Sequence, residues 1–343
     1  MSAYHVPPDA CDVKLDANES PWPPTPAMQR AVEHATKNLA LHRYPDAGAH
    51  ALKAALALHA GVPESSLLVG NGSDEIIAML CAAFGEPDAE GPGRVVFSSP
   101  GFVIYSIEAV LHGLVPVEVP LGHRFVADAD TFIAAIEKTR PNLVFLATPN
   151  NPTGTVWSRG DLERVVASAR DSVVVIDEAY LAYSGEESCV DLALSVNDGR
   201  CVVLQTLSKI GLAALRVGYL VGRPEMVAEL EKARPPYNLD ALSQAVATAV
   251  VSRCGDELRA HARSVREERA RLVAELSRIR DLELFESGAN FVLVRTATPI
   301  SARLRSDGIA VRSYPSGPLA GCTRITVGTP DENDRLLAVL AAG

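Results

Sequence analysis

The chain has 343 residues, of which 48% are hydrophobic, and its formal net charge is −10. This length and composition can bury a large core, which predicts one large domain with a smaller companion. The acidic balance, without a basic stretch of useful length, argues against a nucleic-acid partner. No apolar run resembles a secretory signal or approaches a membrane span, so we expect a cytoplasmic protein that makes no membrane contact.

The cysteines and histidines give no indication of a metal site. The six cysteines lie far apart and form no Cys-x-x-Cys pair, so we expect reduced, mostly buried thiols. His34, His42, His50 and His59 recur at gaps of eight, eight and nine residues. A step of eight residues on a helix turns the side chain by roughly 80°, so these imidazoles would not share a face. The sequence therefore predicts no bound metal.

The beginning of the chain, residues 1–44, predicts an arm rather than a domain. It is rich in proline, asparagine and charge from residue 13 onward, and it holds one candidate helix at about 25–39. Apolar residues then recur at helical spacing over residues 48–58 and 73–84, which predicts two further helices.

Short β-rich runs alternate with helical patterns from residue 94 onward. The runs are apolar throughout, which is typical of parallel strands covered by helices on both faces. Helices at 131–138 and 161–169 fit as crossovers between them. The pattern predicts an α/β fold with a large doubly wound, mostly parallel sheet in a domain over residues 45–240. The clearest strands span residues 95–98, 143–147, 173–176, 202–205 and 217–221.

A second pattern begins near residue 239. A helix through residue 252 is followed by a long amphipathic helix at about 257–279, whose charges indicate a solvated face. Strands and helices then alternate to the end, which predicts a smaller C-terminal α/β domain over residues 241–343. The expected strands are 282–286, 291–295, 309–313 and 324–327, and the expected helices are 301–306 and 331–341.

The segment Thr206-Leu207-Ser208-Lys209 places one lysine among groups that bind phosphate. It follows an apolar strand, so Lys209 would lie past the carboxyl end of that strand, where open α/β sheets hold their ligands. Burial and a nearby cation such as Arg216 would favour the neutral amine, which forms a Schiff base with an aldehyde. A surface lysine beside two ordinary hydroxyls is the alternative.

The loop Gly70-Asn71-Gly72-Ser73-Asp74-Glu75 predicts an anion site at the start of a helix. Asn71 can cap the helix, Gly72 allows close approach of the backbone, and the amides of Ser73 and Asp74 are free to bind an anion. A plain helix cap would look similar. The third glycine of a dinucleotide fingerprint and the acidic residue about 20 positions later are missing, which disfavours a nicotinamide dehydrogenase.

Three further strand ends carry polar or aromatic side chains. Asp177 ends a strand, and a carboxylate there can pair with a protonated pyridine nitrogen. Tyr180 and Asn151 can reach a neighbouring phenolate oxygen, and Phe102 can lie flat on an aromatic ring. Taken singly, these residues also fit a strand-end acid, a turn-forming Asn-Pro and core aromatics. Together with Lys209 they predict one site.

The combined motifs resemble the fold type I pyridoxal-phosphate aminotransferases of class I and II, and within them most closely the histidinol-phosphate aminotransferases. The resemblance covers nearly the whole chain. It is carried by Leu15-Asp16-Ala17-Asn18-Glu19, Arg43-Tyr44-Pro45-Asp46, the Gly70 loop, Asn151-Pro152-Thr153-Gly154, Asp177-Glu178-Ala179-Tyr180, the Lys209 segment and Thr323-Arg324-Ile325-Thr326-Val327-Gly328.

The resemblance implies roles for these residues around pyridoxal 5'-phosphate. Lys209 would form the Schiff base and shuttle the proton, Asp177 would pair with the ring nitrogen, and Tyr180 and Asn151 would donate to the phenolate. Tyr44 would reach the phosphate from the other subunit, so a homodimer with shared active sites is expected, the arm packing on the smaller domain and on the partner. The remaining implied cofactor contacts are Gly72, Ser73, Asp74, Phe102, Thr206, Ser208 and Arg216.

The substrate implied by the resemblance is an amine with a phosphate. Arg324 and Arg312 match arginines that bind the substrate anions, and two guanidinium groups suit a phosphate dianion as well as the carboxylates of glutamate and 2-oxoglutarate. A surface ion pair is the alternative for Arg312. Ser20 stands where the family often carries asparagine or an aromatic residue, and Asn151 is a further candidate substrate contact.

The expected reaction therefore converts L-histidinol phosphate and 2-oxoglutarate to imidazole-acetol phosphate and L-glutamate, a step of histidine biosynthesis. Three other activities stay open at this point. An aromatic or broad-specificity aminotransferase and a threonine-phosphate decarboxylase would both keep Lys209. A non-catalytic module that senses the cofactor shares this fold in some transcription factors, but the chain has no attached basic DNA-binding region.

Overall fold

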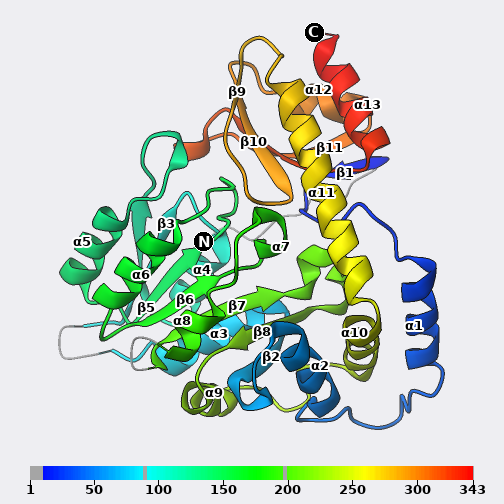
Figure 1. Ribbon diagram of the computed structural model, residues 1–343. Coiled ribbons are helices and arrows are strands. Elements are labelled where there is room, and N and C mark those ends of the chain that lie inside the picture. Colours follow the sequence, from blue (N-terminus) through cyan, green and yellow to red (C-terminus); the bar gives the residue numbers. More distant parts are fainter. Residues whose placement is uncertain (1–10, 88–90, 196–198, 343) are drawn as a thin grey trace.

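Two separate β-sheets organise the chain (Figure 1). The computed structural model describes residues 11–87, 91–195 and 199–342. One sheet has seven strands in the order β2-β8-β7-β6-β5-β3-β4, and the other has five in the order β1-β11-β12-β10-β9. The expected fold class, a large mostly parallel sheet with a smaller α/β part, is confirmed.

The seven-stranded sheet is parallel except at one strand. β8 runs antiparallel to both of its neighbours, β2 and β7, so the parallel direction expected for residues 217–221 is wrong. Only residues 207–216 join β7 to β8, and a parallel pair needs a crossover of about a dozen residues or more. The strands are β2 (Leu67–Asn71), β3 (Arg94–Ser99), β4 (Val115–Pro120), β5 (Leu143–Ala147), β6 (Val173–Asp177), β7 (Cys201–Thr206) and β8 (Val217–Val221).

Helices bury both faces of this sheet. Alternate residues of one strand enter different cores: Val174 and Ile176 join one hydrophobic cluster, and Val173 and Val175 join the other. This explains why the strands are apolar throughout. The first cluster includes residues of α1 (Pro26–Thr36), α2 (His50–Ala60), α5 (Ala129–Thr139), α6 (Arg159–Ser168), α8 (Val190–Ser195) and α10 (Ala241–Arg253), and the second those of α3 (Gly72–Phe84), α4 (Val103–Leu111) and α9 (Pro224–Glu231).

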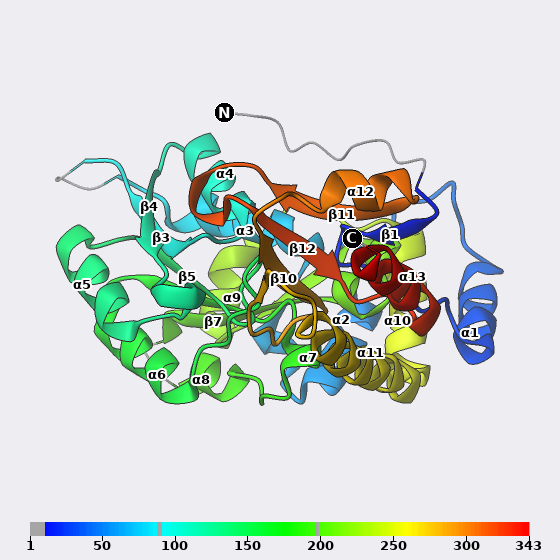
Figure 2. The same ribbon diagram turned by 90° about the horizontal axis from the view of Figure 1, so that it is seen from above.

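The five-stranded sheet has a core of its own and takes one strand from the arm. β1 (Val13–Leu15) pairs in parallel with β11, and Figure 2 shows it beside that strand. The helix α1 of the same arm packs instead in the core of the larger sheet, through Met28 and Ala31. The other elements here are β9 (Leu282–Leu284), β10 (Phe291–Thr296), β11 (Ile309–Tyr314), β12 (Cys322–Thr326), α11 (Gly255–Leu276), α12 (Ser301–Ser306) and α13 (Pro330–Ala341).

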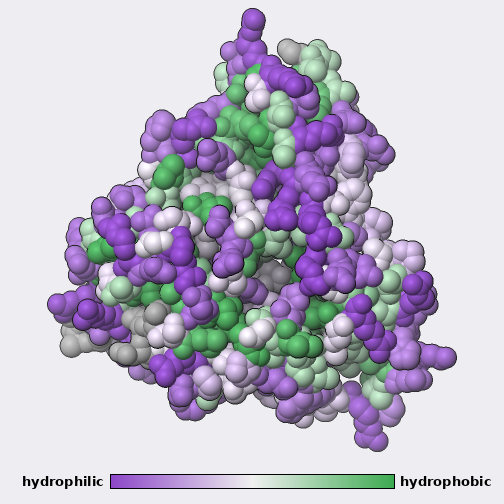
Figure 3. All heavy atoms as spheres, viewed as in Figure 1, coloured by the Kyte–Doolittle hydropathy of each residue, from purple (hydrophilic) through white to green (hydrophobic). Residues whose placement is uncertain are grey.

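The long helix α11 has the amphipathic character expected from its sequence. Leu258, Val265, Leu272 and Leu276 lie buried at helical spacing, and polar side chains follow the helix on the face seen in Figure 3. Over the described part of the chain, no helix combines the length and the apolar character that crossing a membrane requires.

Candidate active site

A cavity of about 240 Å³ lies where strands β5, β6 and β7 reach their carboxyl ends. Ala147, Asp177 and Thr206, the last residues of these strands, all line it. The arm contributes Asn18, and β12 of the other sheet contributes Arg324. The cavity thus occupies the crevice in which open α/β sheets bind ligands, and residues far apart in the sequence close it.

One end of the cavity is built for an anion. Ser73 and Asp74 lie in the first turn of α3, where backbone N–H groups are not used by the helix. The Arg216 guanidinium donates to the Ser208 hydroxyl at 3.1 Å and to the Asp74 carboxylate at 3.1 Å. Gly72 has a φ of 76°, and a Cβ there would lie 2.5 Å from the Arg216 Nη2 atom. Glycine is therefore required for this arginine to sit against the helix.

Two details of the anion end differ from the expectation. The Asn71 side chain does not cap α3; its amide donates to the Asn238 carbonyl, and the Glu75 carboxylate accepts from the Asn71 N–H instead. The Thr206 hydroxyl donates to the Val217 carbonyl across to β8, so its proton is already used. Turn geometry and strand pairing decide both contacts, and neither can be read from the local sequence.

Replacing Arg216 with glutamine is expected to weaken binding of pyridoxal 5'-phosphate about 10- to 100-fold, because hydrogen bonds to a charged partner contribute about 1.5–3 kcal/mol. The measurement is a titration of the cofactor-free protein with pyridoxal 5'-phosphate and, separately, with pyridoxal, which lacks the phosphate. Pyridoxal affinity should hardly change. Arg223→Gln, on a half-exposed arginine paired with Glu225, is the matched control. An equal loss for both ligands would contradict a phosphate contact.

Asp177 is a buried carboxylate at the end of β6 that faces the cavity. It is 5% exposed, and burial raises its pKa to about 6 although it accepts hydrogen bonds from the Tyr105 hydroxyl at 2.6 Å and from the Ala179 N–H at 2.9 Å. A charge in such surroundings is costly unless a cation pairs with it. The position therefore fits a cationic ring nitrogen.

Lys209, Tyr180 and Asn151 meet in the same cavity. Lys209 lies in the short 3-10 helix 207–210 after β7, and its Nζ atom is 5.8 Å from the centre of the Tyr180 ring. The Tyr180 hydroxyl accepts from the Asn18 amide at 2.9 Å. The Asn151 amide oxygen accepts from Arg324 Nη1 at 2.6 Å. Phe102 lines the cavity too and contacts Tyr105 edge to face.

Four of the expected site residues are absent from the lining of this cavity, although one of them, Gly72, directly precedes the lining residue Ser73. Tyr44 is 81% exposed and stacks on Tyr237, with ring centres 4.6 Å apart. Ser20 lies near Gly211, and its buried hydroxyl has no hydrogen-bond partner among the described residues. Arg312 lies directly opposite Arg324 in the register of the antiparallel strands β11 and β12, so the two side chains share a face of the five-stranded sheet.

Asn18 and Tyr105 line the cavity without having been assigned a role beforehand. Asn18 stands in one of the motifs quoted above, so a signal for it existed. Tyr105 lies in the first turn of α4, a helix that the sequence pattern did not predict. Its position three residues after Phe102 would have indicated that it reaches the same site.

The geometry agrees with the comparison to known proteins. The family model for class I and II aminotransferases matches residues 12–340, and the chain belongs to this family. Histidinol-phosphate aminotransferase 1 of Burkholderia lata is 42% identical to it, over 99% of this chain and 94% of that protein. The histidinol-phosphate aminotransferase of Methylibium petroleiphilum is 41% identical, over 99% and 91%.

A solved structure with a bound cofactor is also similar. Histidinol-phosphate aminotransferase from Sinorhizobium meliloti, in complex with pyridoxal-5'-phosphate, superposes with a TM-score of 0.86 at 28% sequence identity. The match covers 97% of this chain and 92% of that one. The fold is therefore shared over nearly its full length with an enzyme that holds this cofactor.

Proposed function

We propose that this aminotransferase exchanges the amino group between L-histidinol phosphate and 2-oxoglutarate, giving imidazole-acetol phosphate and L-glutamate. The full-length similarity to histidinol-phosphate aminotransferases at about 40% identity carries the proposal. The site supports it, because Arg324 lies in the cavity and Arg312 lies beside it on the neighbouring strand. Two guanidinium groups on one face suit a phosphate dianion.

The residues of the cavity fit pyridoxal 5'-phosphate at both ends. Arg216, Ser208 and the first turn of α3 would hold the phosphate, and the buried Asp177 carboxylate would hold the protonated ring nitrogen. When bound, the cofactor supplies the electron sink for cleavage of the bond to the α-proton. Phe102 would cover the ring, and Tyr180 and Asn151 would bind its phenolate oxygen.

The chain's own groups then orient the reactants and move one proton. The Lys209 amine would bind the cofactor aldehyde, and once released by the substrate amine it would take the α-proton and return it to the cofactor carbon. Asp177 would keep a proton on the ring nitrogen, because a buried carboxylate stabilises an adjacent cation. Arg324 would bind the substrate anion and align its α-carbon with Lys209.

Replacing Arg312 with alanine is expected to raise KM for L-histidinol phosphate about tenfold and to leave KM for phenylalanine nearly unchanged. The reason is that a charge-assisted hydrogen bond to phosphate contributes about 1.5 kcal/mol or more, while phenylalanine has no phosphate. Steady-state kinetics with both amines measures the effect. Arg280→Ala, at an exposed arginine, is the control. Equal losses for both amines would exclude a phosphate contact at Arg312.

One assay distinguishes the proposal from the other activities that keep Lys209. The purified protein is tested for a visible cofactor absorbance and for transfer from glutamate to imidazole-acetol phosphate beside phenylpyruvate, with threonine phosphate as a test of decarboxylation. The proposal expects turnover of the phosphorylated acceptor. Turnover of phenylpyruvate alone would assign a broad-specificity enzyme, release of carbon dioxide a decarboxylase, and a bound cofactor without turnover a sensing module.

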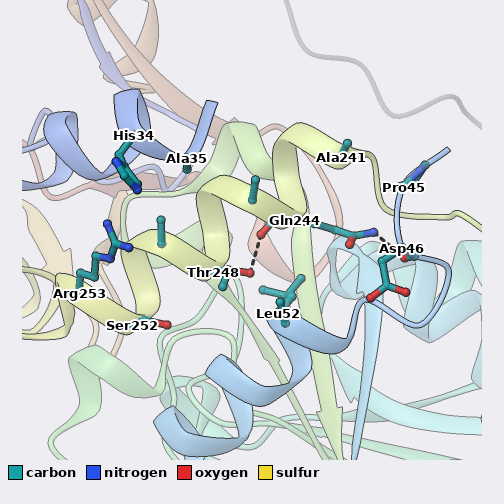
Figure 4. Close-up of a pocket in the computed structure, with 13 residues that line it drawn as sticks. His34, Ala35, Pro45, Asp46, Leu52, Ala241, Gln244, Thr248, Ser252 and Arg253 are labelled. Carbon is teal, nitrogen blue, oxygen red and sulfur yellow. Dashed lines mark hydrogen bonds between the residues drawn. The ribbon is translucent and has the colours of Figure 1, made fainter. Parts of the chain in front are cut away.

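The proposal includes a homodimer with shared active sites. A groove of about 430 Å³ runs between α1, α2 and α10, and His34, Leu52 and Thr248 line it (Figure 4). Leu41 and Tyr44, in the segment between α1 and α2, are more than four-fifths exposed. Large apolar side chains exposed in one short segment beside this groove fit a surface that a second copy would cover, and that copy would receive Tyr44 at its phosphate end.

Location and domain limits are part of the same proposal. The six cysteines are unpaired, which supports a cytoplasmic location. The two sheets support a division into an arm, a larger cofactor-binding domain and a smaller C-terminal domain. Because Val246 and Val250 of α10 enter the core of the larger sheet, we place the boundary after α10 rather than at the expected residue 240.

A further inference from the structure

Asn18 is a buried arm residue that ties three parts of the chain together. It is 1% exposed and has a φ of 54°, a left-handed conformation that asparagine adopts more readily than most residues. Its N–H donates to the Thr326 hydroxyl of β12 at 3.0 Å, and its carbonyl accepts from the Asn290 amide at 3.0 Å. Its side chain reaches Tyr180, 162 positions away.

The Thr326 hydroxyl fixes the direction of the Asn18 amide. The Thr326 hydroxyl oxygen accepts from the Asn18 N–H at 3.0 Å and donates its one proton to Asn18 Oδ1 at 3.1 Å. The amide oxygen of Asn18 therefore faces β12, and its NH₂ group faces the Tyr180 hydroxyl oxygen at 2.9 Å. The flipped amide would remove the acceptor of the Thr326 proton and place an NH₂ group in its position.

The Asn18 donor in turn fixes the direction of the Tyr180 proton. With one lone pair of its oxygen occupied, Tyr180 is free to donate its own proton, and within residues 11–87, 91–195 and 199–342 it donates to none. The ring is held edge to face against Phe291, with centres 5.3 Å apart, and it lines the cavity. The hydroxyl proton is therefore directed at whatever occupies the cavity.

We propose that Asn18 is a positioning residue that holds Tyr180 as a hydrogen-bond donor toward the phenolate oxygen of the cofactor. The inference rests on the proposed function and adds to it a route by which the five-stranded sheet acts on the cofactor. β12 orients both phenolate donors: Thr326 acts through Asn18 on Tyr180, and Arg324 bonds Asn151 directly. Residues 324 and 326 are two positions apart along β12, so their side chains lie on the same face of the strand.

Asn18→Gly tests the inference, because glycine tolerates the left-handed φ and keeps both backbone bonds while removing the amide side chain. A phenolate that loses its donor holds its shared proton more tightly. We therefore expect the pH midpoint of the visible absorbance of the pyridoxal 5'-phosphate holoenzyme to rise by about one unit, as loss of about 1.4 kcal/mol at a charged acceptor requires. Glu19→Ala, at the exposed neighbouring residue, should leave the midpoint in place.

The decisive comparison repeats Asn18→Gly in a Tyr180→Phe background. If Asn18 acts through the Tyr180 hydroxyl, the second change adds almost nothing to the midpoint, whereas independent effects would add fully. A full second shift overturns the inference. Asn18→Asp, which keeps size and φ but offers only acceptors, should raise the midpoint further and lower kcat; an unchanged midpoint there also overturns it. The absorbance titration needs no substrate, so it stands even if imidazole-acetol phosphate is not turned over.

Discussion

Lys209→Ala is expected to lower amino-group transfer by about 10⁴-fold or more while leaving the fold intact. Proton transfer by a positioned side chain alone contributes about 10²–10⁴-fold, and the covalent attachment of the cofactor is lost as well. Removal of the amine leaves the strand before it untouched, since Lys209 lies in a short 3-10 helix past the end of β7. The measurements are kcat with glutamate and the thermal unfolding midpoint.

A chemical trap makes the prediction independent of turnover. Borohydride reduction of the wild-type holoenzyme should attach the cofactor irreversibly, and peptide mass mapping should place it on Lys209. The alanine variant should bind pyridoxal 5'-phosphate reversibly and gain no mass. Lys138→Ala, at an exposed lysine, is the control and should behave as wild type. A mass gain on any lysine other than 209 would refute the assignment.

The sequence carried enough information to place Lys209 and Asp177, because Asp177 ends one apolar strand and Lys209 lies three residues past the end of another. Parallel strands end at one edge of a sheet, so residues that follow them meet there without further knowledge of the fold. The predicted parallel direction of β8 was wrong because its apolar pattern resembles that of a buried parallel strand. Only the short length of the loop before β8 indicates that the strand runs antiparallel to β7.

The contacts that orient the site could not be predicted in the same way. Asn18 bonds Tyr180 and Thr326, which are 162 and 308 positions away, and Tyr105 bonds Asp177 across 72 positions. Such pairs depend on how two sheets and an arm pack, and no local periodicity encodes them. The contact expected of Tyr44 cannot be predicted from local patterns either, because its target lies in a second copy of the chain.

Asp177 is expected to destabilise the protein without its cofactor and to support the reaction with it. Burial raises its pKa from 3.8 to about 6, so the folded chain binds this proton more tightly than the unfolded chain does. The stability that Asp177 contributes is therefore complete below about pH 3.8 and is lost as the pH rises through about 6. Near pH 7.5 the ionised carboxylate costs the cofactor-free fold about 3 kcal/mol, on the scale of 1.36 kcal/mol per pKa unit.

Asp177→Asn should accordingly raise the free energy of unfolding of the cofactor-free protein at pH 7.5 by up to about 3 kcal/mol, and by much less at pH 4, where wild-type Asp177 is protonated. Asparagine keeps an acceptor and fits the space between Tyr105 and Ala179. Urea unfolding at both pH values measures the difference. The same variant should bind pyridoxal 5'-phosphate more weakly and lose about 10²-fold or more in kcat, because the ring nitrogen loses its anionic partner.

Glu178→Gln separates this effect from the general cost of a buried carboxylate. Glu178 is buried beside Asp177, and burial raises its pKa too, but it accepts from Ser188, Cys189 and Gln205. In glutamine one of the two acceptor oxygens becomes an NH₂ group that faces one of these donors, so the replacement should lower stability even though the raised pKa acts in the opposite direction. Opposite signs of the stability change at these two adjacent buried acids would show that Asp177, unlike Glu178, needs a cation from outside the chain to stabilise its charge. A loss of stability in Asp177→Asn at pH 7.5 would contradict that assignment, since it would show that groups of the protein already stabilise the ionised carboxylate without a cationic ring nitrogen.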